Sequence, residues 1–335
     1  MKKFAVILAG GRGERFWPLS QPDFPKQFLT IFDDKPLLIQ TLQRIRRHFT
    51  RGERLLIIPK ELKALTKKYV GGENIAVEPV RRNTAPAICL AGMILRRKFG
   101  SGVMHVMPAD HLIAPRNAFI SALKYGQRLA EQGYLVTYGI RPDRPETGYG
   151  YIRLGRRMGM QGKNKSYEGA GFTEKPGMKR ARHYVRSRRY LWNSGIFTFN
   201  IATILAEIKN YVPDVYHGVE KFIAQRRIRH FEQVPDISID YGVMERSRQL
   251  CVVEGRFSWD DVGSWLALGR YFKKDGKMNV LVGDARGVQI EDTIMFSQDV
   301  PLRAYDVKGL IVIVSPHGVL VCKKDRAQDL KKLFK

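Results

Sequence analysis

Hydrophobic and polar positions in the first half of the chain alternate between two patterns. Short apolar runs of strand length are separated by longer stretches in which apolar residues recur with helical spacing. The predicted strands cover residues 4–8, 54–58, 75–77, 103–107 and 135–138, and the predicted helices cover residues 37–49, 61–69, 85–99 and 118–132. This succession is typical of βαβ units. It predicts an α/β fold with a Rossmann-like mixed, mostly parallel sheet sandwiched by helices.

The pattern changes from about residue 146 onward. Residues 147–152 and 172–176 have the composition of turns that join strands, and we expect them in a lobe facing the first half across a cleft. After Trp265 a series of short apolar runs is separated by Gly or Asp, at residues 280–283, 288–290, 293–296, 309–314 and 319–321. These runs predict a small all-β appendage, followed by a final helix over residues 326–334.

The charge of the chain narrows the range of partners. Lys and Arg number 58 against 32 Asp and Glu, a formal net charge of +26, which would attract nucleic acid, anionic lipid or small polyphosphates. The basic residues are dispersed and form no nucleic-acid-binding module, and no apolar stretch is long enough to span a bilayer. We therefore expect neither nucleic acid nor a membrane as partner. Three widely separated cysteines indicate a reducing, cytoplasmic location.

A glycine-rich turn directly follows the first predicted strand. Ala9, Gly10, Gly11 and Gly13 supply backbone N–H groups in a segment that can curl closely around an anion, and phosphate is the natural candidate. The third glycine of a dinucleotide fingerprint is missing, and so is the Gly-Lys-Ser/Thr of a P-loop. A tight strand-to-helix turn without a ligand is the alternative interpretation.

The residues after this turn give it a more specific meaning. Arg15 is followed by Pro18-Leu19 and then by Pro25-Lys26, and the segment resembles the signature of the nucleoside diphosphate sugar pyrophosphorylases. Phe16 and Gln21 depart from the family's usual residues without touching its chemical roles. Further strings resemble the family in its own order along nearly the whole chain: residues 78–86, 108–111, 147–152, 172–176, 192–197, 240–245 and 261–265.

The resemblance implies the nucleotidyltransferase fold and a division of the chain. Residues 1–265 are expected to form the catalytic domain, with a nucleotide half over about 1–145 and a sugar-phosphate half over about 146–265. Residues 266–335 are expected to form a short left-handed β-helix-like appendage of a kind that often mediates dimer contacts, which allows a homodimer. Some relatives carry an additional cupin-like domain. Residue 335 is reached without one, so a single activity is expected.

The resemblance also implies a reaction. The strings at residues 83–86 and 261–265 favour the branch that transfers GMP from GTP to α-D-mannose 1-phosphate, giving GDP-mannose and pyrophosphate by direct in-line displacement at the α-phosphorus. Several negative charges must meet in this reaction, so it needs cations, backbone donors and a metal more than a nucleophilic side chain. Two alternatives stay open: a pyrophosphorylase for another sugar 1-phosphate and nucleoside triphosphate, and a non-catalytic regulatory paralogue that binds nucleotide sugars.

Roles in the nucleotide and metal sites follow from the same resemblance. The turn from Ala9 to Gly13 would hold the triphosphate, while Arg15 and Lys26 would be catalytic by neutralising the departing pyrophosphate. Asp110, beside the nucleotide, and Asp261 would bind Mg²⁺ or another divalent cation through hard oxygen ligands. Asp260 is a rival for Asp261, and we interpret it as a loop cap or supporting residue.

Roles in recognition of the sugar and the base are implied in the same way. Gly148, Glu174, Lys175 and Asn193 would bind the sugar phosphate, although a Glu-Lys pair can also be an ordinary solvated ion pair. Guanine presents N–H donors, so acceptors are needed to select it. The candidates are Glu78 and the carbonyl groups of Asn83, Thr84 and Ala85, for which a helix cap is a complete structural alternative.

Overall fold

The computed structural model describes residues 1–334, and its contacts divide the chain into two compact units. The sheet unit combines Met1–Gly10 with Thr41–Trp259, and the carboxyl-terminal unit combines Gly11–Gln40 with the chain from Asp260 onward. The chain thus leaves the sheet unit directly after Gly10 and returns to it at Thr41. The sequence-based domain boundary at residue 265 stays a prediction.

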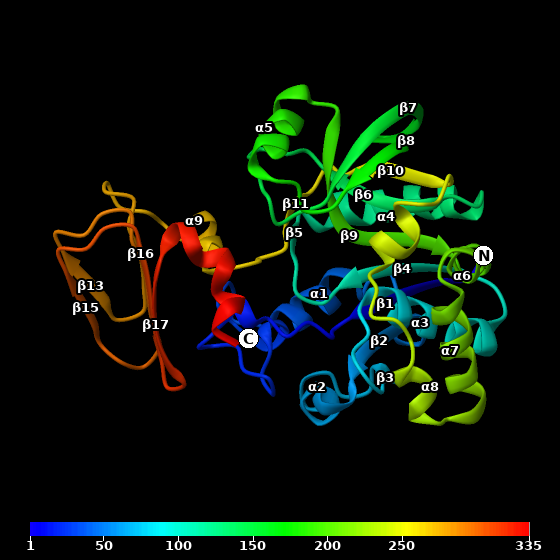
Figure 1. Cartoon of the computed structure of the whole chain (residues 1–335), viewed down its shortest axis with the longest axis horizontal. Coiled ribbons are helices and arrows are strands. Elements are labelled where there is room, and N and C mark those ends of the chain that lie inside the picture. The colour runs from blue at the N-terminus through cyan, green and yellow to red at the C-terminus, as the bar shows by residue number, and fades with distance from the viewer. Residues whose placement is uncertain (335) are drawn as a thin grey trace. The chain divides into compact units, whose positions relative to one another are not determined.

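The sheet unit has one large sheet of nine strands, in the order β3-β2-β1-β4-β9-β6-β10-β8-β7 (Figure 1). The strands are β1 Lys3–Leu8, β2 Arg54–Pro59, β3 Asn74–Glu78, β4 Val103–Pro108, β6 Leu135–Ile140, β7 Tyr151–Gln161, β8 Asn164–Thr173, β9 Tyr190–Asn200 and β10 Leu250–Glu254. All of them run in one direction except β8 and β9, which are antiparallel to their neighbours. The predicted mixed, mostly parallel sheet is therefore confirmed.

Helices cover both faces of this sheet. They are α2 Lys63–Tyr69, α3 Thr84–Phe99, α4 Arg116–Glu131, α5 Met178–Ser187, α6 Ile201–Tyr211, α7 Pro213–Gln225 and α8 Ile228–Glu232, while α1 Leu37–Ile45 begins before the unit's boundary. Two short strands, β5 Leu112–Ala114 and β11 Ser258–Asp260, pair outside the large sheet.

Side-chain alternation along β9 separates the two faces. Phe197 and Phe199 belong to the large hydrophobic core that includes residues of α3, α6 and α7. Thr198, between them, points to the other face, where its hydroxyl is hydrogen-bonded to His105 and Tyr138. On that face α4 comes so close that a Cβ at Gly126 would lie 2.1 Å from the Tyr138 hydroxyl. The period-2 alternation of a strand thus explains why both faces carry helices.

The carboxyl-terminal unit contains mostly parallel strands. They are β12 Val280–Val282, β13 Ala285–Val288, β14 Ile294–Ser297, β15 Leu302–Tyr305, β16 Leu310–Ser315 and β17 Gly318–Lys323. β12, β14 and β16 pair in parallel, as do β13 and β15, while β17 is antiparallel to β16. Ala285, Ile290, Met295 and Leu302 form a small core of their own. The β-helix-like appendage is confirmed, and its left-handedness stays a prediction.

The sequence pattern placed some elements wrongly. α1 ends at Ile45 and not at Phe49, whose ring is buried against His105 at a centroid distance of 5.3 Å. Strand β15 was missed because exposed Arg303, which pairs with Asp284, interrupts its apolar run. The predicted second strand at 288–290 lies instead at Ala285–Val288. The final helix is confirmed but is a 3-10 helix, Lys324–Phe334.

Buried Trp265 ties the start of the carboxyl-terminal unit to its strands. The Trp265 ring packs against Phe16 and Phe296 at centroid distances of 5.0 and 5.6 Å, and its indole N–H donates to the Trp17 carbonyl at 3.0 Å. A short 3-10 turn at Trp265–Ala267 and helix α9, Leu268–Tyr271, lead from it to the β strands. Within residues 1–334 there is no helix that combines the length and hydropathy needed to cross a membrane.

Candidate active site

The glycine-rich turn begins at the carboxyl end of β1, in the sheet unit. The Ala9 amide donates to the Ile57 carbonyl at 2.9 Å, which continues the pairing of β1 with β2. The Gly10 carbonyl accepts a hydrogen bond from the Arg81 guanidinium, which also forms an ion pair with Glu61 at 2.8 Å. The first two residues of the turn are therefore fixed by backbone pairing and by a cation.

Gly13 is the glycine of this turn that no other residue could replace without strain. Its φ of +66° lies in the left-handed region, and an added Cβ would lie 2.4 Å from the Cβ of Lys26. Its carbonyl accepts hydrogen bonds from the Phe16 amide at 2.8 Å and the Ser20 hydroxyl at 2.7 Å. Gly11, by contrast, has open space around its Cβ position. Gly13 therefore allows the turn and the lysine segment to lie in contact.

Lys26 is almost fully buried, with 6% of its surface exposed. Its ammonium group donates to the backbone carbonyl of Asp261 at 2.6 Å and lies 6.0 Å from the centre of the Phe16 ring. A buried ammonium group is costly unless it is hydrogen-bonded. The Asp261 carbonyl supplies such a bond, so the predicted catalytic lysine and a predicted metal ligand are joined in one unit.

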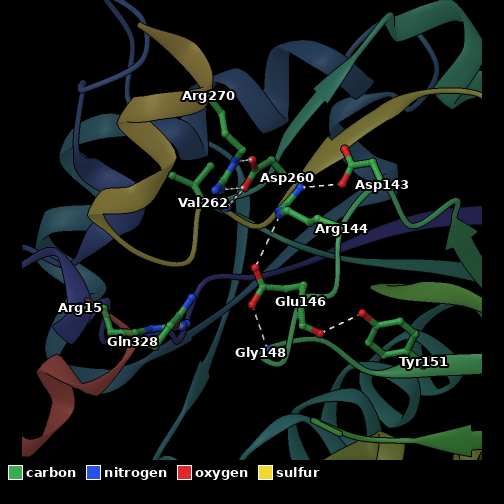
Figure 2. Close-up of polar contacts among 10 residues, drawn as sticks. All are labelled: Arg15, Asp143, Arg144, Glu146, Gly148, Tyr151, Asp260, Val262, Arg270 and Gln328. Atoms are coloured by element: carbon green, nitrogen blue, oxygen red, sulfur yellow. Dashed lines mark hydrogen bonds and ion pairs between the residues drawn. The ribbon is translucent and has the colours of Figure 1, made fainter. Parts of the chain in front are cut away.

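Arg15 is held by the last segment of the chain. Its guanidinium donates to the side-chain oxygen of Gln328, in the final 3-10 helix, at 2.6 Å (Figure 2). Because Gln328 is neutral, this contact orients Arg15 without compensating its charge. Sequence reasoning missed Gln328, since a glutamine in a charged helical segment gives no signal of this contact.

Asp260 and Asp261 have different surroundings. Asp260 is buried, forms an ion pair with Arg270 at 2.5 Å and accepts the Val262 amide at 2.7 Å (Figure 2). It therefore acts as the loop cap that the sequence suggested. At Gly263 an added Cβ would lie 2.8 Å from an Asp261 carboxylate oxygen, so this glycine leaves room for that carboxylate.

Asp110 lies just beyond the carboxyl end of β4, as the pattern predicted. Its carboxylate is 24% exposed and lies 3.9 Å from His111 Nε2. His111 in turn accepts the Trp259 indole N–H at 3.0 Å on Nδ1, which fixes the position of its ring. Asp110 and Asp261 belong to different units, so their joint metal site stays a prediction. Residues 1–334 contain no group of three or more His, Cys, Asp or Glu side chains poised as metal ligands.

The predicted sugar-phosphate residues lie in the sheet unit. Glu174 and Lys175 form an ion pair with side-chain exposures of 14% and 62%, so the carboxylate is sheltered and the ammonium group faces solvent. The Gly148 amide, which we expected to bind the sugar, donates to the Glu146 carboxylate at 3.1 Å (Figure 2). Trp192 belongs to the core, as expected.

Asn193 is bound on three sides. Its backbone amide donates to the Gly150 carbonyl at 2.8 Å. Its side-chain oxygen accepts the Thr137 hydroxyl at 2.9 Å, and its side-chain nitrogen donates to the Asp240 carboxylate at 2.8 Å. The family resemblance includes residues 240–245 but implies no role for Asp240.

The guanine candidates are engaged by the chain itself. Asn83, at φ +69°, caps α3 by accepting the Thr84 amide at 3.0 Å. The Thr84 hydroxyl accepts the Ile239 amide at 2.8 Å, and the Ala85 amide donates to the Ile237 carbonyl at 3.1 Å. These bonds show that Asn83 caps α3, as the alternative interpretation of this segment expected. The guanine role of these residues stays a prediction.

Glu78 is the buried carboxyl group among these candidates. It is 5% exposed, and its burial raises its pKa to about 7. The carboxylate accepts the Arg82 amide at 3.4 Å, a weak bond that offsets the cost of burial only in part. A buried carboxylate with one weak hydrogen bond can accept further hydrogen bonds from a ligand. The guanine role of Glu78 stays a prediction.

Gly13→Ala is expected to destabilise the protein by roughly 2–4 kcal/mol, from the left-handed backbone and the overlap with Lys26. Gly11→Ala, which adds the same methyl group where space is open, is expected to change stability by less than about 1 kcal/mol. Urea unfolding of both variants measures this difference. Equal stabilities would contradict the proposed contact between Gly13 and Lys26.

Comparisons with known proteins identify the family of the chain. Residues 4–277 match the family model Nucleotidyl transferase, and residues 286–335 match the MannoseP isomerase/GMP-like beta-helix domain. The chain is 38% identical to a mannose-1-phosphate guanylyltransferase of Salmonella muenchen, over 99% of this chain and 72% of that protein. It is 37% identical to one of Escherichia coli strain K12, over 99% and 73%.

A solved structure agrees over the full length. The crystal structure of a protein named mannose-1-phosphate geranyltransferase, from Thermus thermophilus, superposes with a TM-score of 0.89 at 39% identity, covering 100% of this chain and 98% of that chain. The match includes the sheet, the glycine-rich turn and the terminal strands, because it covers the whole chain. The chain belongs to the nucleotidyl transferase family.

Proposed function

We propose that this protein transfers GMP from GTP to α-D-mannose 1-phosphate, giving GDP-mannose and pyrophosphate. The names of the relatives that align over nearly the full chain support these substrates. The observation that carries the proposal is the joined arrangement of Gly13, Lys26 and Asp261, in which a glycine turn lies against a buried lysine hydrogen-bonded to an aspartate residue. A turn of backbone donors beside fixed cations suits a triphosphate.

The two cations have distinct roles in this proposal. Lys26 is buried and fixed, so it neutralises charge at one position without having to reorganise during the reaction. Arg15 is oriented by a neutral amide and keeps its charge for a phosphate oxygen. As the bond from the α-phosphorus to the bridging oxygen breaks, both would stabilise the pyrophosphate that leaves in line with the attacking sugar-phosphate oxygen.

Asp110 and Asp261 would hold the metal ion. Both offer carboxylate oxygens, the hard ligands that Mg²⁺ prefers, and Gly263 leaves the space in which the Asp261 carboxylate lies. When bound, Mg²⁺ would polarise the α-phosphate and reduce repulsion between the two substrates. The bidentate contact of Asp260 with Arg270 supports assigning the metal to Asp261.

The sugar phosphate would be bound by residues from two strands and their ends. Lys175, mostly exposed, is suited to the phosphate group, while sheltered Glu174 and the Asn193 amide are suited to hydroxyl groups. The Gly148 amide would have to exchange its Glu146 partner for the ligand. Each of these groups binds or orients the attacking molecule and needs no covalent step.

A homodimer is part of the proposal, supported by β17. This strand lies at the edge of its four-stranded sheet, and Val319 and Val321 are 57% and 60% exposed, whereas Leu320 between them is buried. An edge strand with apolar side chains can pair with a second copy.

A cytoplasmic location is also part of the proposal and is supported by three free cysteines. Cell fractionation would test it.

Pyrophosphate release tests the activity. The purified protein with Mg²⁺ is given each of four nucleoside triphosphates with mannose, glucose or N-acetylglucosamine 1-phosphate. Release is expected with GTP and mannose 1-phosphate, and Asp110→Ala or Asp261→Ala should lower kcat by at least about 100-fold through loss of a metal ligand. Release only with another pair would refute the substrates and keep the mechanism. Inactivity with every pair would favour the regulatory paralogue.

Sedimentation equilibrium tests the dimer. The double variant Val319→Lys, Val321→Lys is expected to shift a dimeric parent to monomers, because two charges would then lie at the paired edge. Val288→Lys, at an equally exposed valine of β13, serves as the matched control and should remain dimeric. A monomeric parent at micromolar concentration would contradict this part of the proposal.

A further inference from the structure

Asp240 lies at the start of an unusual turn whose position is fixed by α3. Residues Asp240–Met244 form one turn of π-helix, a form often found at functional sites. The preceding segment is anchored by the Thr84 hydroxyl, which accepts the Ile239 amide, and by the Ala85 amide, which donates to the Ile237 carbonyl. The helix cap described above therefore also sets the position of Asp240.

The Asp240 carboxylate determines which way the Asn193 side chain points. An amide has an oxygen with two acceptor positions and a nitrogen with two N–H groups. The Asn193 oxygen accepts from the Thr137 hydroxyl at 2.9 Å and from the Gly195 amide at 3.3 Å, while its nitrogen donates to Asp240 at 2.8 Å. Both acceptor positions are occupied, so one N–H group remains for a ligand.

Glu174 lies close to this pair of residues. At Gly150, whose carbonyl accepts the Asn193 amide, an added Cβ would lie 2.5 Å from a Glu174 carboxylate oxygen. Burial raises the pKa of Asp240 to about 7, and repulsion from Glu174 contributes, opposed by the Asn193 hydrogen bond and by Lys175. Asp240 nevertheless keeps part of its surface exposed. A pair of neighbouring carboxyl groups, of which the Glu174 side chain is 14% exposed, suits a ligand rich in hydroxyl groups.

We propose that Asp240 is a positioning and specificity-determining residue of the sugar-phosphate site, which orients the Asn193 amide and accepts a hydrogen bond from a hexose hydroxyl group. A hydroxyl group can donate to the Asp240 carboxylate and accept from the remaining Asn193 N–H at the same time. The pair therefore recognises a hydroxyl oxygen at one position, and a sugar with another stereochemistry there would leave both groups unpaired. This inference rests on the proposed function.

Asp240→Asn tests the inference, because it keeps the shape and removes the charge. The matched control is Glu245→Gln, which removes a negative charge from the same turn at an exposed residue that is also influenced by Glu174. Steady-state kinetics are measured with GTP and with mannose and glucose 1-phosphates. Asp240→Asn is expected to raise KM for mannose 1-phosphate roughly 10- to 100-fold, to reduce the preference for mannose, and to leave KM for GTP within about twofold.

The dependence on pH provides a readout that a purely structural role would not change. The charged groups that act on Asp240 are Glu174 and Lys175. Because the Asp240 pKa is raised, its carboxyl group loses its proton only as the pH rises through about 7. The ratio of kcat/KM for the parent to that for Asp240→Asn should therefore rise between pH 6 and 8. Titration of the substrate phosphate affects both proteins alike and cancels in this ratio.

The failing outcomes are distinct. An unchanged KM for mannose 1-phosphate in folded Asp240→Asn would overturn the inference while the proposed function stands. Equal increases in KM for mannose 1-phosphate and for GTP would do the same. An inactive parent that binds no mannose 1-phosphate by calorimetry would overturn both. If Asp240→Asn does not fold, Thr137→Val removes the other fixed partner of the Asn193 side chain at nearly constant volume. An unchanged KM for mannose 1-phosphate there would overturn the inference equally.

Discussion

The contact between Gly13 and Lys26 is the constraint on which the nucleotide end of this protein depends. A left-handed glycine without a side chain lets two segments of the chain touch, and the lysine buried by this contact reaches the Asp261 carbonyl. The part of the glycine-rich turn from Gly11 onward thereby belongs to the carboxyl-terminal unit, together with Trp265 and the last helix. The terminal strands are therefore more than an appendage, since residues that fold with them carry both proposed catalytic cations.

The charge of the reacting phosphates explains why Lys26 and Arg15 are held in fixed positions. Attack of one phosphate on another is opposed by repulsion, and cations that are already oriented lower this barrier without a cost of reorganisation at the moment of reaction. Lys26 is fixed by burial and Arg15 by Gln328. In the sheet unit, the carboxyl groups of Glu174 and Asp240 lie near each other and would accept hydrogen bonds from hexose hydroxyl groups, while Lys175 would bind the sugar phosphate. In the proposed function, the two substrates would thus meet groups that match the charge of each part.

The sequence predicted β1, β2, β3, β4 and β6 because these strands are short apolar runs bounded by turns, and the carboxyl end of β4 placed Asp110 correctly. It gave no bounds for β7 to β10, of which β7 and β8 carry charged residues. It missed β15, where Arg303 breaks the apolar pattern, and it extended α1 to Phe49, which is buried for a tertiary reason. The site shows the same limit. Motifs identified Arg15, Lys26 and Asn193 as candidates. They could not identify Gln328, the partner of Arg15, or Asp240, the partner of Asn193, which are 313 and 47 residues away in the chain. The sequence also could not show whether the Gly148 amide and the Asn83 side-chain nitrogen are free to bind a ligand. In the folded chain they donate to the carboxylates of Glu146 and Asp236.

The central claim is that the turn anchored by Gly13 and Lys26 holds the triphosphate of the nucleotide. Titration calorimetry with GTP and with GMP, on the parent and on Lys26→Met, tests it most directly. The account predicts that the parent binds GTP at least about 100-fold more tightly than GMP, and that Lys26→Met removes most of this difference while GMP affinity changes little. Equal affinities for GTP and GMP in the parent, or equal losses for both in the variant, would contradict it.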